Sequence, residues 1–119
     1  MGVRVEYIEG LTVSGQYFHD ERLVEIKAGL SPVIERSVMA HEAAHAELRH
    51  RPEEAWCHAI QNERMASAMA GRRLINFREF MELKAAGIGE SQMAKRLGVA
   101  RGILRAYTWI TAPAWDLAA

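Results

Sequence analysis

Two histidines separated by three residues, His41 and His45, constrain the fold of this chain more than any other feature. In a helix, residues four positions apart lie on one face, so both imidazoles can bind the same metal ion. Glu42 points to the same open side, where a carboxylate can accept a proton from a water molecule on the metal. The segment His-Glu-Ala-Ala-His therefore predicts a helical, hydrolytic metal site. The alternative is a helix that carries two histidines on its surface.

The residues around the histidines favour the helix. Residues 33–48 carry apolar side chains at mixed three- and four-residue spacing, and Ser31-Pro32 is a typical helix start. Alanines at positions 43, 44 and 46 are small, so other groups can approach the metal face closely. We expect one amphipathic helix from about residue 33 to residue 48.

A catalytic zinc site has three protein ligands and leaves a position for water, so a third ligand is needed. Pro52 can sit in the first turn of a second helix that runs to about Ile75. Glu63 lies in the middle of that helix, and a hairpin of the two helices brings it back over the histidines. Its rivals are Glu53 and Glu54, which lie in the first turn, where acidic residues also have a capping role. As the other alternative, Glu63 is a solvated helix charge.

These elements together resemble the ImmA/IrrE family of small zinc metallopeptidases, which occur in bacteria, phages and mobile elements. The resemblance rests on HEAAH, a Pro-containing break, and the pattern ExxAxxxAxxxLI that starts at Glu63. It implies one Zn²⁺ per chain, held by His41, His45 and Glu63, with Glu42 as general base. The sequence departs from the gluzincin pattern at Ser67, where an acidic residue often orients a zinc-bound histidine.

The resemblance also implies a function, that of a zinc-dependent endopeptidase in a phage or mobile-element regulatory circuit. Its substrate would be a helix-turn-helix transcriptional repressor. The alternative is a regulatory module that binds DNA or a repressor without cutting, with a structural or vestigial metal site. Manganese or iron can also occupy a site of this donor set.

A peptidase of this kind also needs a donor that stabilises the negative oxygen of the transition state. The sequence offers four candidates for that donor and does not rank them. They are Tyr17, His19, His50 and His58.

The wider pattern predicts an α+β fold. Residues 3–8, 16–19 and 23–27 alternate as strands of a small antiparallel sheet that precedes the two helices. The resemblance implies that one edge of such a sheet binds substrate as an added strand. As the alternative, the strands only cover the histidine helix. We assign residues 1–75 to a metallopeptidase core and residues 76–119 to a helical extension packed on it.

The extension has helix-turn-helix spacing over residues 90–109, with Ala94 for close helix packing and Gly98 for the turn. Residues 1–70 hold 7 Lys and Arg against 11 Asp and Glu, whereas residues 71–119 hold 8 against 4. This basic half is compatible with DNA binding, but packing or partner docking is the favoured interpretation. Trp109, Pro113 and Trp115 are expected to anchor the C-terminal end, or else to mark a partner surface.

Composition places the protein in the cytoplasm as a single domain without a membrane segment. Its one cysteine, Cys57, excludes an internal disulfide, and no signal-like segment starts the sequence. No run of 18 apolar residues is present. The sequence leaves the oligomeric state open.

Overall fold

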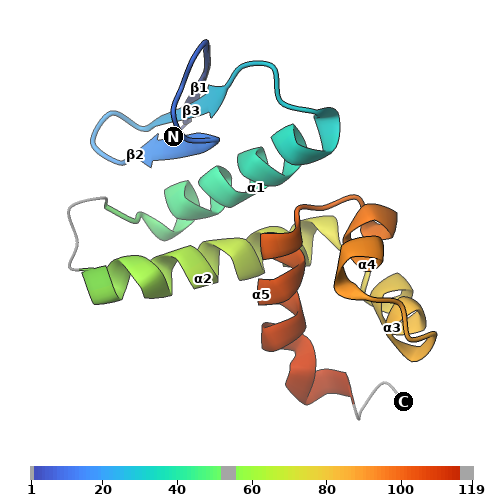
Figure 1. Ribbon diagram of the computed structural model, residues 1–119. Coiled ribbons are helices and arrows are strands. Elements are labelled where there is room, and N and C mark those ends of the chain that lie inside the picture. Colours follow the sequence, from blue (N-terminus) through green and yellow to red (C-terminus); the bar gives the residue numbers. More distant parts are fainter. Residues whose placement is uncertain (1, 52–55, 116–119) are drawn as a thin grey trace.

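The computed structural model describes residues 2–51 and 56–115, which form an α+β fold in layers (Figure 1). A three-stranded sheet covers one side of helix α1, and helix α2 packs on the other side. The remaining helices lie at one end of α2. The elements are β1 (Arg4–Ile8), β2 (Gly15–Phe18), β3 (Leu23–Lys27), α1 (Pro32–Leu48), α2 (Trp56–Leu74), α3 (Phe77–Ala85), α4 (Glu90–Leu97), α5 (Arg101–Thr111) and a 3₁₀ turn (Ala112–Ala114). The predicted fold class is confirmed.

The sheet is mixed, with the strand order β1-β3-β2. β2 and β3 form the expected antiparallel hairpin, whereas β1 pairs with β3 in parallel, so the sheet is not wholly antiparallel as expected. The reason is the connection between β1 and β2, which crosses from one side of β3 to the other. β3 is central because its side chains Val24 and Ile26 are the most apolar and most buried in the sheet, at 2% and 0% exposure. β2 is consequently an edge strand.

α1 begins and ends where the sequence predicts. The side chain of Ser31 accepts a hydrogen bond from the backbone N–H of Ile34, and Pro32 occupies the first turn, where its missing N–H costs nothing. Arg49 ends the helix in the left-handed conformation, with φ at 57°.

α1 and α2 pack on each other, and both helices carry buried alanines. The buried alanines are Ala44 and Ala46 in α1 and Ala66, Ala68 and Ala70 in α2. The predicted start of α2 at Pro52 lies outside the described residues. Its end at Leu74 matches the prediction to one residue, and Asn76 then caps α3 through the N–H of Glu79.

α4 and α5 have the predicted helix-turn-helix geometry. Gly98 adopts φ 70°, ψ 40°, a left-handed turn that glycine takes without strain, and Ala94 is 3% exposed beneath it. α5 packs on α2 where Gly71 meets Tyr107 so closely that a Cβ on the glycine would lie 2.9 Å from the tyrosine Cβ. Phe80 of α3 completes this cluster.

The two C-terminal tryptophans behave differently. Trp115 packs against Phe80 and under the ammonium group of Lys84, so its predicted anchoring role is confirmed. Trp109 is 69% exposed, and the prediction that it anchors the C-terminal end is wrong. The apolar residues of α5 that do pack, Ile103, Leu104 and Tyr107, lie on its other face.

Residues from both predicted parts of the chain share one hydrophobic cluster. Ala70 and Ile75 pack with residues 80–107, while a second cluster joins the sheet to α1. The division at residue 75 stays a prediction. In residues 2–51 and 56–115, no helix is both long and apolar enough to cross a bilayer.

Candidate metal centre

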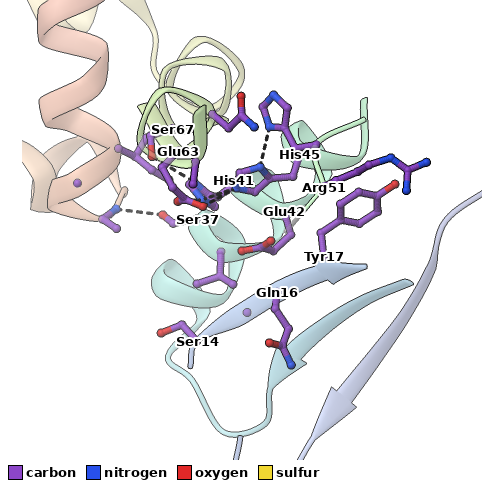
Figure 2. Close-up of a pocket in the computed structure, with 18 residues that line it drawn as sticks. Ser14, Gln16, Tyr17, Ser37, His41, Glu42, His45, Arg51, Glu63 and Ser67 are labelled. Carbon is purple, nitrogen blue, oxygen red and sulfur yellow. Dashed lines mark hydrogen bonds and ion pairs between the residues drawn. The ribbon is translucent and has the colours of Figure 1, made fainter. Parts of the chain in front are cut away.

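Three side chains converge between α1 and α2. Nε2 of His41 lies 2.8 Å from a carboxylate oxygen of Glu63, Nε2 of His45 lies 2.9 Å from the other, and the two Nε2 atoms are 3.1 Å apart. The helical spacing of four residues places the two imidazoles side by side in an edge-to-face arrangement, and the α1–α2 hairpin brings Glu63 over them (Figure 2). The structure therefore brings together all three residues that the sequence singled out as metal ligands. The rivals Glu53 and Glu54 lie outside the described residues.

The three donor atoms lie close enough together to share one metal ion. Tetrahedral Zn²⁺ holds nitrogen and oxygen ligands at roughly 2.0–2.1 Å, which separates neighbouring ligand atoms by about 3.3 Å. The three observed separations of 2.8, 2.9 and 3.1 Å are slightly shorter, so the donor atoms would have to move apart by about 0.2–0.5 Å to hold such an ion. The Glu63 side chain is 63% exposed, which leaves it able to shift. The triad can hold one metal ion.

The outer ring nitrogens of both histidines have partners. Nδ1 of His41 lies 3.1 Å from the hydroxyl of Ser67, and Nδ1 of His45 lies 2.8 Å from Nδ1 of His50. With a metal bound, a proton on each Nδ1 would be donated to these acceptors, and both Nε2 lone pairs would be free to bind the ion. Gluzincins often have an acidic residue at this position, beside a metal-bound histidine. In this protein the neutral hydroxyl of Ser67 lies beside His41 instead.

Electrostatics within the triad favour an ionised Glu63. Hydrogen bonds from His41 and His45 hold the pKa of Glu63 well below its usual range. Burial disfavours the charged form of His41, but the hydrogen bond and charge of Glu63 and the charge of Glu42 outweigh it and raise the His41 pKa. Glu63 therefore supplies an anionic donor, which suits a divalent cation.

Glu42 lies beside the triad and is 6% exposed. Figure 2 shows its carboxylate on α1 between the histidine pair and β2. Burial raises the pKa of the Glu42 carboxyl, and positive charge on His41 and His45 offsets only part of that rise. A carboxylate with a raised pKa is a better proton acceptor near neutral pH.

β2 approaches Glu42 closely because residue 15 is a glycine. A Cβ on Gly15 would lie 3.2 Å from Cγ of Glu42 and 2.5 Å from Cγ1 of Val38. The edge of the sheet therefore forms a wall of the site beside the proposed base.

A cleft of about 470 Å³ opens over the triad, and its lining includes β2 on one side and the start of α5 on the other. Of the four candidate oxyanion donors, Tyr17 and His50 line this cleft, whereas His19 and His58 do not. The Tyr17 hydroxyl is held by Arg22 and by Nδ1 of His19, the latter at 2.8 Å. The sequence expectation of a donor in this group stays a prediction for Tyr17 and His50.

Two residues of α1 join the site to the C-terminal helices. The hydroxyl of Ser37, one turn before His41 and 1% exposed, accepts a hydrogen bond of 3.0 Å from the N–H of Ala100. The Arg36 guanidinium donates to the carbonyl of Gly98. The start of α5 is thereby fixed against the cleft.

The comparison with known families agrees with this geometry. Residues 1–106 match the peptidase family described as the IrrE N-terminal-like domain. The chain belongs to this family. Membership supports a metallopeptidase-type function, and the match covers the sheet, the triad and most of α5. A comparison with curated proteins finds no significant match to this chain.

The sequence alone did not predict several contacts around this site. His50 was considered only as an oxyanion donor, yet it lies against the outer nitrogen of His45. Its position five residues after His45, just past the end of the helix, was an available signal. Gly15 and Ser37 gave no comparable signal, because their roles depend on residues from other elements.

Proposed function

We propose that this protein is a zinc-dependent endopeptidase, with His41, His45 and Glu63 as ligands and Glu42 as general base. The observation that carries the proposal is the convergence of three donor atoms beside a buried carboxylate with a raised pKa. Bound zinc supplies Lewis acidity and lowers the pKa of water at its open position to roughly 7.

The protein side chains do the remaining work. Glu42 takes a proton from the attacking water and delivers it to the leaving amine, and burial keeps bulk water from competing. Ser67 and His50 hold the two imidazoles in orientation. The free edge of β2 offers backbone groups to an extended peptide beside Glu42.

The family resemblance extends the proposal to the substrate and setting. The proposed substrate is a helix-turn-helix transcriptional repressor, cut in the cytoplasm as part of a phage or mobile-element circuit. The alternative is a binding module with a structural metal. Among residues 2–51 and 56–115 the candidate ligand set has three members, which favours catalysis over that alternative, since structural zinc sites have four.

Two measurements test the proposal, metal content by mass spectrometry and cleavage of a peptide library made from a digested bacterial lysate. The wild type should carry one zinc per chain and cleave the library. Glu42→Gln should keep the zinc and lose cleavage by roughly 10²-fold or more. His45→Ala and Glu63→Ala should lose both.

Glu47→Gln is the matched control, because Glu47 is an exposed glutamate of the same helix that pairs with Arg73. This variant should behave as the wild type. Undiminished cleavage by Glu42→Gln, or a wild type that takes up no zinc, refutes the proposal.

A further inference from the structure

The outward face of α5 is a wall of a groove. Gly102, Arg105, Ala106 and Trp109 follow one another at helical spacing, and across a cavity of about 400 Å³ they face Glu63, Arg64 and Ser67 of α2. In a helix-turn-helix protein this face of the second helix would enter a DNA groove. Here α2 stands opposite this face and forms the other wall of the groove, whereas a recognition helix has its outward face open.

This groove adjoins the catalytic cleft. Glu63, Ser67 and Gly102 line both cavities, so the groove begins at a proposed metal ligand. At its far end Trp109 and Arg64 also line a third cavity of about 360 Å³. The three hollows follow one another from the triad along α5 to Trp109, and together they are called the channel.

The far end of the channel is apolar and exposed. Trp109 is 69% exposed, and Ile60 and Met65 on α2 are each 47% exposed. Clusters of exposed large apolar side chains at the end of a groove are typical of binding surfaces.

Positive charge lies beside this apolar end. Arg64 is exposed on α2, and Arg105 lies one turn before Trp109 on α5. Arg105 shares the carboxylate of Glu90 with Arg101, so two guanidinium groups have one acid between them. The surface therefore suits an acidic group next to an apolar one.

We infer that this channel is an exosite that binds a segment of the protein substrate beyond the scissile bond, with a large apolar side chain at Trp109 and an acidic residue at Arg64 and Arg105. The inference rests on the proposed peptidase function. From Gly102 to Trp109 is seven residues of helix, or ~10 Å, which an extended peptide covers in about three residues. The apolar residue accordingly lies three to five positions from the cleaved bond.

Gly102 provides a direct test, because it lies where the cleft meets the groove. A Cβ there meets nothing within 4 Å, so a side chain can start at this position, and Gly102→Leu should narrow the passage. The zinc-loaded wild type, Gly102→Leu and Trp109→Ser are compared on the lysate-derived peptide library. Tyr7→Ser is the control, since Tyr7 is an aromatic of β1 that is 52% exposed and does not line the channel.

We expect wild type and Tyr7→Ser to prefer substrates with a large apolar residue three to five positions from the bond. Gly102→Leu and Trp109→Ser should lose this preference and keep the preference at the bond itself. A wild type that cleaves without the distal preference, or variants that retain it, overturn the exosite and leave the peptidase function intact.

A binding measurement decides the exosite even if no peptide is cleaved. The indole N–H signal of Trp109, assigned by its loss in Trp109→Phe, is followed by NMR in Glu42→Gln. The probe is a capped ten-residue peptide with leucine and two glutamates among serines. We expect a saturable shift, and roughly ten-fold weaker binding when the leucine is replaced by serine. If millimolar peptide does not shift the Trp109 signal, the exosite is overturned. The same holds if only a 30-base-pair DNA duplex, and not the peptide, shifts that signal.

Discussion

The hydroxyl of Ser67 controls how firmly His41 is held, and its removal gives a quantitative prediction. Ser67→Ala deletes the acceptor that lies 3.1 Å from Nδ1 of His41 and leaves the ring free to rotate or change tautomer. One such hydrogen bond contributes about 1 kcal/mol, which corresponds to about a five-fold change in an equilibrium constant. Loss of the partner of a metal-bound histidine typically costs 10–100-fold in metal affinity. We expect zinc affinity to fall by about ten-fold.

Ser67→Asp is the complementary change. A carboxylate makes hydrogen bonds about twice as strong as a neutral acceptor, so this variant should bind zinc more tightly than the wild type. Zinc affinity is measured by competition with a chromophoric chelator at one pH. Ser91→Ala serves as the control, because Ser91 is an exposed serine of α4 that lies outside the cleft. If Ser67→Ala binds zinc within two-fold of the wild type, the proposed orientation of His41 is refuted.

Three further predictions concern the wall of the cleft, the core and a surface ion pair. Gly15→Ala places a Cβ 2.5 Å from Val38, so β2 must shift; peptide cleavage should fall several-fold at unchanged zinc content, and a parallel loss of zinc would contradict this. Phe80 is 1% exposed, so Phe80→Ala leaves a cavity in the core and should lower the free energy of unfolding, measured in urea, by about 3–5 kcal/mol. A loss below about 1 kcal/mol would show that neighbouring side chains move in to fill the cavity. Hydrogen bonds from Arg105 and, to a lesser extent, Arg101 lower the pKa of Glu90 from 4.5 to about 2. The ionised carboxylate therefore stabilises the fold above about pH 4.5, and this stabilisation is lost as the pH falls toward 2. An NMR titration of the Glu90 carboxyl should show that low pKa, and Arg105→Gln should move it back toward 4.5; an unchanged titration would argue against the pair.

The parts of this protein that could be predicted from its sequence are those that depend on local spacing. The interval between His41 and His45 fixes a shared helical face, and Ser31-Pro32 fixes where that helix begins. Glu63 could be chosen over its rivals because a hairpin of two helices brings the middle of the second helix opposite the histidines. Gly98 marked the turn between α4 and α5 for the same kind of local reason.

The parts that could not be predicted depend on contacts between distant segments. The hydrogen bond from Ala100 to Ser37 joins residues 63 positions apart, and no periodic sequence pattern predicts such a contact. β1 pairs with β3 in parallel because β3 is the buried, central strand of the assembled sheet. The alternation of apolar residues within one strand does not reveal which strand will be central. Trp109 was expected to pack because tryptophan usually does, yet α5 turns its other face to the core.

The position of α1 between the sheet and α2 limits how this helix can change over evolutionary time. Only four of its residues are exposed, namely Pro32, Val33, Arg36 and Glu47. Pro32 starts the helix, Arg36 binds the carbonyl of Gly98 and Glu47 pairs with Arg73, so Val33 alone is left without a described task. Neutral drift in α1 should therefore collect at Val33, and new substrate preferences should arise from substitutions in β2 and α5, which line the cleft and contribute no member of the triad.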